Sequence, residues 1–184
     1  MGGMGASDCE GIGQGLLAQP VNTLSSIAFV LAGVWIVYRA LGSSIGRARM
    51  VLFGMAVASV GVGSILYHGP QPGEAQLVHD GTIAIVVAGV AALELMRGRR
   101  GVQRDRDGYL LALAALLLGA VAFTFGRTNS PLCSPGDVLQ LHALWHVLAA
   151  LALIAYASAE RWAPGKGRPG RQRTRRSARP SSPR

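Results

Sequence analysis

The chain contains four histidines, and each of them lies in a long apolar stretch or at its end. They are His68 in "GVGSILYHGP", His79 in "AQLVHDGTIA", and His142 and His146 in "LHALWHVLAA". Residues four apart share one face of a helix, so the last two histidines can point at one ion. Ionisable side chains are costly in hydrocarbon, and we therefore expect these residues to have a function.

Three imidazoles and a carboxylate are the ingredients of a catalytic zinc site, which uses three protein ligands and leaves a fourth position for water. His68 would complete the ligand set that the pair in the last stretch begins. Asp80, directly after His79, would orient the water or take its proton. Ser64 lies four residues before His68, so its hydroxyl could stabilise a developing oxyanion. The residue types and spacings thus predict a hydrolytic zinc centre.

The stretches that carry these residues predict membrane-spanning helices. Five apolar blocks are present, at residues 22–41, 50–68, 77–96, 108–125 and 138–158. Each approaches the ~20 residues that cross a bilayer as a helix. Helices that are apolar on all sides belong in a membrane or in a large core, and a chain of 184 residues cannot build a core that hides five of them. We predict an all-α integral membrane protein, a polytopic helical bundle with five spans.

The basic residues predict the orientation of these spans. They concentrate in residues 39–49, 97–106 and 166–184, whereas the other two connections contain a single one, Arg127. By the positive-inside rule the basic segments are cytoplasmic, which places the N-terminus outside and the C-terminus in the cytoplasm. With this topology, the three span ends that carry the histidines and Asp80 meet at one depth, near the extracytoplasmic leaflet.

The predicted organisation has three parts: an extracytoplasmic N-terminal segment (1–21), a transmembrane helical domain (22–158) and a basic cytoplasmic tail (159–184). The tail is rich in Pro, Gly, Arg and Ser, and we expect it to be disordered and attracted to anionic lipid headgroups. No folded module accompanies its arginines, so nucleic acid is not an expected partner. Both cysteines, Cys9 and Cys133, fall on the outside, where a disulfide bond can form.

Other interpretations of the histidines are open at this point. Two histidines at matching depth could ligate a haem, as in membrane b-type cytochromes, but this leaves Asp80 and Ser64 without a role. His79 stands at a span end, where a histidine often binds a carbonyl group or water of the interface. A transporter or proton relay is a further alternative, although transporter sites lie near the midplane of the bilayer.

The ordered set of motifs resembles a known superfamily. Ser-x-x-x-His at residues 64–68, Asp80 at the start of the next span and His-x-x-x-His at 142–146 are similar to the pattern of the CREST membrane hydrolases, which include alkaline ceramidases and adiponectin receptors. The segments "DCE" and "QPVNTLSSIAFVLAG" resemble the alkaline ceramidase family in particular. Matching segments are spread over residues 8–158.

The resemblance implies a zinc-dependent amidase that cleaves the N-acyl bond of ceramide, releasing a sphingoid base and a fatty acid. It implies zinc binding by His68, His142 and His146, with Asp80 assisting the water and Ser64 supporting the transition state. It also implies a calcium ion near the N-terminal segment, where the matching residues are Asp8, Glu10 and Gln19, and a disulfide between Cys9 and Cys133. Gln19 stands where the family has a glutamate, and Asp8 replaces the tryptophan that precedes the cysteine, so the calcium positions are incomplete.

Two further departures from the family concern the spans and the carboxylate. Familiar members have seven spans, whereas this chain has five apolar blocks. The spacing from His68 to Asp80 is one residue longer than in ceramidases, and an alignment without a gap places His79 at the carboxylate position. We assign the role to Asp80, because water activation requires a carboxylate. The Ala- and Arg-rich composition indicates that the protein resides in a bacterial cell membrane. The alternative function is that of a zinc-containing, receptor-like member of the superfamily without turnover.

Overall fold

The computed structural model describes residues 3–43, 46–100 and 105–159. Within these ranges the chain is all-helical and forms no strand. The helices are α1 (Pro20–Ser25), α2 (Ile27–Leu41), α3 (Arg47–His68), α4 (Ala75–Arg100), α5 (Arg106–Phe125) and α6 (Leu141–Ala159). The basic tail from residue 160 onward, for which we predicted disorder and lipid contacts, lies outside the described residues.

Five segments of this structure are long and apolar enough to cross a membrane. They are Pro20–Leu41, which joins α1 and α2, Arg47–His68, Ala75–Arg97, Arg106–Phe125 and Leu141–Ala159. Each one overlaps an apolar block recognised in the sequence, so the predicted helical bundle with five spans is confirmed. The protein is a multi-pass integral membrane protein.

The first span is broken at Ser26, between α1 and α2. The Ser26 hydroxyl donates to the carbonyl oxygen of Asn22 at 2.7 Å, and the Ser26 backbone N–H donates to the same oxygen at 3.1 Å. The backbone N–H of Phe29 then donates to the Ser26 carbonyl oxygen, a bond that spans three residues where an α-helix spans four. At the start of α1, the two carboxylate oxygens of Glu10 accept from the backbone N–H groups of Val21 and Asn22. These N–H groups have no partner within a helix, so Glu10 caps the helix from outside it.

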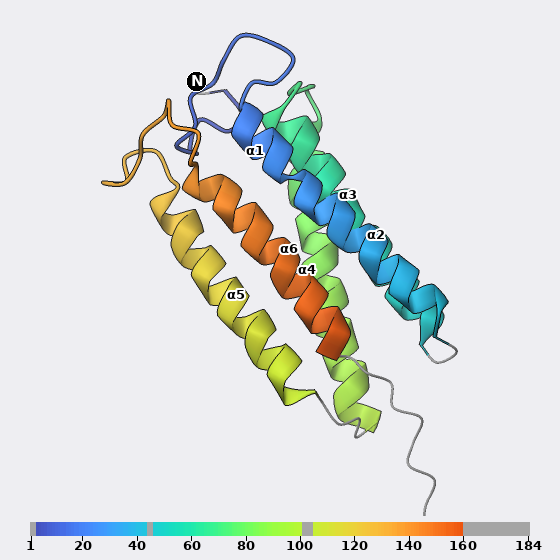
Figure 1. The fold of residues 1–184 in the computed structure, drawn as a ribbon. Helices are drawn as coiled ribbons and strands as arrows, with labels where there is room; N and C mark the ends of the chain where they lie inside the picture. Colours follow the sequence, from blue (N-terminus) through green and yellow to red (C-terminus); the bar gives the residue numbers. More distant parts are fainter. Residues whose placement is uncertain (1–2, 44–45, 101–104, 160–184) are drawn as a thin grey trace, which may run out of the picture.

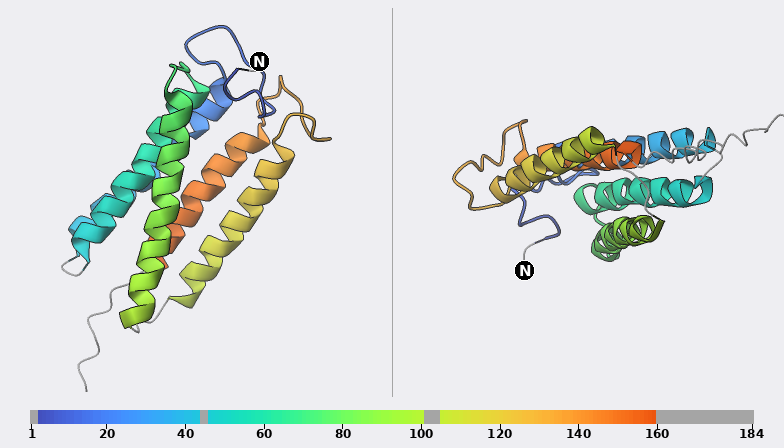
Figure 2. Two further views of the ribbon diagram at one scale, coloured as in Figure 1. Left: turned by 180° about the vertical axis from the view of Figure 1, so that it is seen from behind. Right: turned by 90° about the horizontal axis from the view of Figure 1, so that it is seen from below.

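The helices contact one another in the order α5, α6, α2, α3 and α4. Seen from below, α5, α6 and α2 lie in one layer, and α3 and then α4 lie on one side of it, so that the row curls and has α4 and α5 at its two ends (Figure 2, right). The N-terminal segment and the connection between α5 and α6 lie together at one end of the bundle (Figure 1). The ends of α3 and α6 that carry the histidines are at this same end, as the sequence-based topology requires.

The contact between α2 and α3 is close because glycines face each other across it. A Cβ atom added to Gly33 would collide with the carbonyl oxygen of Gly54 and with the backbone nitrogen of Ala58. A Cβ atom on Gly61 would lie 2.7 Å from the backbone nitrogen of Val30. Small residues allow membrane helices to approach closely and gain dispersion contacts, which here hold α3 firmly against the first span.

Candidate metal centre

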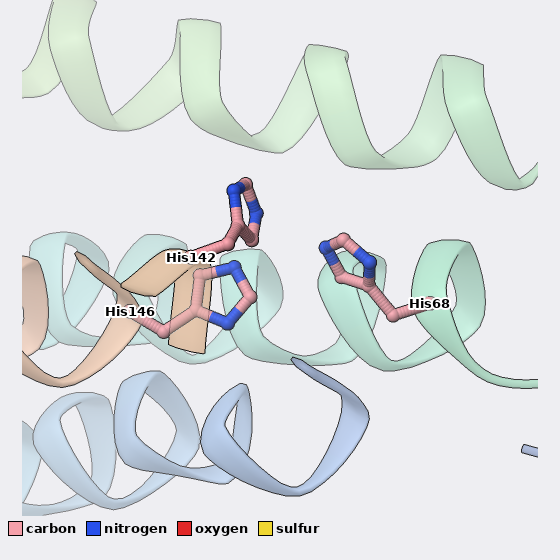
Figure 3. Close-up of side chains that lie close together, drawn as sticks. All are labelled: His68, His142 and His146. Carbon is pink, nitrogen blue, oxygen red and sulfur yellow. The ribbon is translucent and has the colours of Figure 1, made fainter. Parts of the chain in front are cut away.

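Three histidines converge at the N-terminal end of the bundle. His68 ends α3, whereas His142 and His146 occupy the first two turns of α6. Each offers one ring nitrogen, and these nitrogens lie within 4.8 Å of one another (Figure 3). All three residues are buried. The distance between the nitrogens and the residue types match a site with three imidazole ligands.

The ring of His68 is oriented by Gln19. Its Nδ1 lies 2.6 Å from the Gln19 side-chain oxygen, which can only accept, so Nδ1 carries the proton. The other nitrogen, Nε2, then holds a free lone pair, and it is buried without a hydrogen-bond partner. Because an unsatisfied buried polar atom costs about 1–3 kcal/mol, the arrangement calls for a ligand at Nε2. A metal ion fits this requirement, since a ligating histidine typically donates its other ring N–H to a neighbour.

His146 is oriented in the same way by Ser25. The Ser25 hydroxyl lies 2.9 Å from His146 Nδ1 and 2.9 Å from the carbonyl oxygen of Asn22. The carbonyl oxygen can only accept, so the single hydroxyl proton goes to Asn22 and the hydroxyl accepts from Nδ1–H. Nε2 of His146 is therefore the nitrogen available for a metal ion, as in His68.

A buried carboxylate, Asp8, stands beside the histidines. Its Oδ1 lies 3.4 Å from His142 Nδ1, and its Oδ2 lies 4.0 Å from His68 Nδ1. Arg127 donates to Oδ1 at 3.2 Å. Burial raises the pKa of the Asp8 carboxyl to about 6, and the positive charge of Arg127 opposes this effect. Neither Asp8 nor Arg127 was predicted to lie beside the histidines, although Arg127 is the one basic residue in the predicted outer connections.

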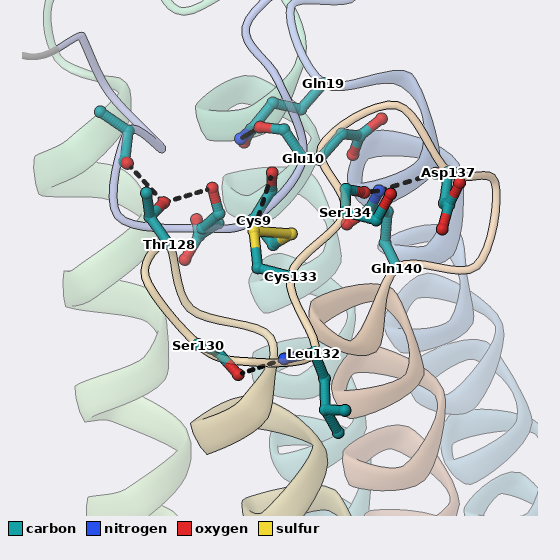
Figure 4. The surroundings of a disulfide bond; sticks show 12 residues. Cys9, Glu10, Gln19, Thr128, Ser130, Leu132, Cys133, Ser134, Asp137 and Gln140 are labelled. Atoms are coloured by element: carbon teal, nitrogen blue, oxygen red, sulfur yellow. Dashed lines mark hydrogen bonds between the residues drawn. A yellow bond between two sulfur atoms is a disulfide. The ribbon is translucent and has the colours of Figure 1, made fainter.

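A disulfide bond between Cys9 and Cys133 ties the N-terminal segment to the connection before α6 (Figure 4). The two residues are 124 positions apart in sequence, and their Cα atoms are 5.4 Å apart. The backbone N–H of Cys9 donates to the Gly126 carbonyl oxygen at 2.8 Å, and the Thr128 hydroxyl bridges two carbonyl oxygens of the same N-terminal segment. These bonds hold Asp8, the neighbour of Cys9, in its position beside His142.

Ser64, His79 and Asp80 line a cavity. The three converging histidines, His68, His142 and His146, line the same cavity. Ser64 is buried on α3, one helical turn before His68. The Asp80 carboxylate is 62% exposed and lies 2.8 Å from Nδ1 of His79. The ring of His79 stacks on Tyr67 at 4.5 Å between centroids and lies 6.1 Å from the ring of His68. His79 and Asp80 thus form a hydrogen-bonded pair at the mouth of the site.

The cavity has a volume of about 680 Å³, which is in the range of small-molecule sites. Beyond the histidines, its walls are mostly apolar and come mainly from α4, α5 and α6, with Phe29 of α2 and Val60 of α3. Two of its lining residues, Val87 on α4 and Leu116 on α5, are 63% and 46% exposed. The cavity is therefore open to the side of the bundle, between the two ends of the curled row of helices.

The three residues at the calcium positions do not fit a calcium ion. Calcium takes six to eight oxygen ligands. Both carboxylate oxygens of Glu10 accept backbone N–H groups, and the Gln19 oxygen accepts from His68. The Asp8 carboxylate faces Arg127 and the two histidines. The side-chain oxygens of all three residues are thus already directed at nitrogen groups.

The family model "Ceramidase" matches residues 14–130, which is more than half of the chain. The chain belongs to the Ceramidase family. No curated protein and no solved structure matches it. The family match includes Gln19, Ser64, His68 and Asp80 but ends before His142 and His146. These two histidines were predicted from their spacing, and the structure brings them together with His68.

In this ceramidase-family chain, replacing Ser25 with alanine tests the geometric basis of the metal site. Ser25→Ala removes the hydroxyl that lies 2.9 Å from His146 Nδ1, leaving the more distant Ser26 hydroxyl at 3.4 Å and the Asn22 backbone as partners of this ring. Loss of such a partner typically weakens metal binding about 10–100-fold. We expect this decrease in zinc affinity, measured by competition with a chromophoric chelator. Ser59→Ala, which removes a hydroxyl bonded within α3 to Ala56, is the control and should leave the affinity unchanged.

Proposed function

We propose that the protein is a zinc-dependent intramembrane amidase that hydrolyses the N-acyl amide bond of ceramide or of a ceramide-like lipid. The observation that carries this proposal is the buried group of His68, His142 and His146 in the wall of an apolar cavity, in a chain of the Ceramidase family. We further propose that the site lies toward the extracytoplasmic leaflet, because the connections at this end of the bundle carry a single basic residue, Arg127.

The ligand set supports zinc over the alternatives. Three neutral imidazoles with two tautomers fixed by Gln19 and Ser25 are the donor set of a hydrolytic zinc site. A haem iron would use two axial histidines and would leave the third without a purpose. When bound, zinc lowers the pKa of a water molecule to about 7 and polarises a carbonyl oxygen.

The remaining polar residues of the cavity have complementary roles in amide hydrolysis. Hydrolysis breaks the bond between the acyl carbon and the nitrogen. The hydroxyl of water adds to the acyl carbon and the remaining proton of that water goes to the departing nitrogen, so that a carboxylic acid and an amine are released. Asp80 accepts the proton of the attacking water and returns it to the amine nitrogen, and His79 holds the Asp80 carboxylate in place. The Ser64 hydroxyl donates a hydrogen bond to the amide oxygen as negative charge develops on it.

The shape of the cavity supports a lipid substrate. It is lined by Asp80 at the outer end of α4 and also by Glu94 near its inner end. At ~1.5 Å per residue, these two positions are about 21 Å apart along the helix. One leaflet contributes about 15 Å of hydrocarbon, so a long acyl chain fits along the cavity when its amide is at the histidines. The lateral opening beside Val87 and Leu116 allows this chain to enter from the bilayer.

Hydrolysis of a fluorescent long-chain N-acyl sphingosine in proteoliposomes tests the proposal. The wild-type protein should release fatty acid, and Asp80→Asn should lower kcat by about 10²–10⁴-fold while zinc content is retained, because a general base is lost and no ligand is. Asp137→Asn is the matched control, since Asp137 is an exposed carboxylate at the same end but outside the cavity. A zinc-loaded wild-type protein without turnover would favour the receptor-like alternative. Full activity of Asp80→Asn would refute the role of Asp80.

A further inference from the structure

Gln19 links the N-terminal segment to the candidate metal centre. It is completely buried at the point where this segment enters α1. Its side-chain nitrogen donates to the carbonyl oxygen of Gly5 at 3.0 Å and to that of Glu10 at 2.8 Å. Its side-chain oxygen accepts from His68 Nδ1 at 2.6 Å. Both N–H groups and the oxygen of the amide are therefore engaged, and they join two parts of the N-terminal segment to one metal-site histidine.

The carbonyl oxygens of Gly5 and Glu10, which both accept from the side-chain nitrogen of Gln19, need a partner that carries positive charge. Carbonyl oxygens can only accept, and two of them converge here on one point in a buried environment. Either N–H donors or a cation can hold such oxygens together, and calcium binds backbone carbonyls in this way. In this chain the amide NH₂ group fills that position. If a carboxylate replaced the amide, its oxygens would face the carbonyl oxygens of Gly5 and Glu10. All of these oxygens are acceptors, so a cation would be required between them.

We infer that the Gln19 amide replaces a structural cation, so that the N-terminal segment is fixed on the metal centre without calcium. Gln19 is then a positioning residue: it orients His68 through its oxygen and holds Gly5 and Glu10 through its nitrogen. The backbone supports the same connection, since the Gln19 N–H donates to the His68 carbonyl oxygen at 2.8 Å. This role does not depend on whether the protein hydrolyses ceramide.

The decisive experiment measures the thermal unfolding of the full-length, zinc-loaded protein in detergent with and without calcium. The calcium-free buffer is prepared without chelator, because a chelator would also remove zinc. We expect the Tm of the wild-type protein to be the same in both buffers. Gln19→Glu should lower the Tm by several degrees in calcium-free buffer, and calcium should restore it, because the new carboxylate and the carbonyls of Gly5 and Glu10 then share a cation.

Gln71→Glu is the matched control. The Gln71 side chain also anchors the N-terminal segment, but it donates to one carbonyl group, that of Met4, at 2.9 Å and contacts no metal-site histidine. The same change of charge there should give no calcium-dependent Tm. A wild-type Tm that rises with calcium would overturn the inference, and so would a Gln19→Glu protein whose Tm does not respond to calcium.

A second variant covers the case in which Gln19→Glu does not fold. Gln19→Ala removes the acceptor of His68 Nδ1–H without adding charge, so zinc affinity should fall about 10–100-fold with no response to calcium. Gln71→Ala should keep the wild-type zinc affinity. Equal zinc affinities of the two alanine variants would contradict the positioning role of Gln19. Neither readout uses hydrolysis, so a failure of the proposed activity would be recognised separately.

Discussion

Substitution of His146 by alanine is expected to abolish both zinc binding and hydrolysis. His146 is buried on α6, and its Nε2 is one of three nitrogens that converge within 4.8 Å. Two histidines cannot hold zinc in a site that needs three protein ligands. Since metal catalysis contributes several kcal/mol to the barrier and each ~1.4 kcal/mol is tenfold in rate, kcat/KM should fall about a thousandfold or more. Fluorescent substrate turnover and metal analysis of the same preparation measure both effects.

The fourth histidine supplies the control for this prediction. His79 lines the same cavity, but its ring is stacked on Tyr67 and is not part of the converging group. His79→Ala should therefore keep its zinc. Elution of both variants as single species in size exclusion shows that the comparison is made between folded proteins. Retention of zinc and of full activity by His146→Ala would remove the basis of the metal centre.

Among the variants proposed for this protein, removal of the disulfide bond should cause the largest decrease in the free energy of unfolding. The Cys9–Cys133 bond closes a loop over a sequence separation of 124 residues, and loss of a native disulfide typically costs about 2–5 kcal/mol. For a chain of this size, such a loss corresponds to a decrease in Tm of about 10 °C. We expect this decrease for the double variant Cys9→Ser/Cys133→Ser, measured by thermal unfolding in detergent.

The same variant should also weaken zinc binding, because the disulfide holds the segment that carries Asp8 beside His142. Reduction of the wild-type protein should reproduce both effects, whereas a reductant should not change the double variant further. If the wild-type protein and the double variant unfold at the same temperature, the disulfide does not contribute to the fold in the way described here.

The spans could be predicted from the sequence because their signal is local. The first four apolar blocks end directly before a glycine or an arginine, and the predicted block 138–158 corresponds to α6 at Leu141–Ala159. The break at Ser26 was not predicted. It accompanies local bonds of Ser26, whose hydroxyl donates to the Asn22 carbonyl oxygen and whose own carbonyl oxygen accepts from Phe29, and an apolar run does not reveal such bonds.

The geometry of the candidate site was only partly accessible from the sequence. The spacing of His142 and His146 places them on one helix face, and the charge-based topology adds His68. The residues that surround these imidazole rings could not be predicted from spacing, because several of them lie in irregular segments, whose sequences have no periodicity. Asp8 and Gln19 reach the histidines through bonds between distant positions, such as the backbone bond from Gln19 to the His68 carbonyl oxygen.

Metal analysis of the purified full-length protein, combined with X-ray absorption at the zinc edge, is the most direct test of a zinc ion bound by the three histidines. We expect about one zinc per chain with three imidazole ligands, and loss of this zinc in His146→Ala but not in His79→Ala. A protein that binds no zinc after purification in zinc-containing buffer, or one that shows the Soret band of a haem, would contradict this expectation.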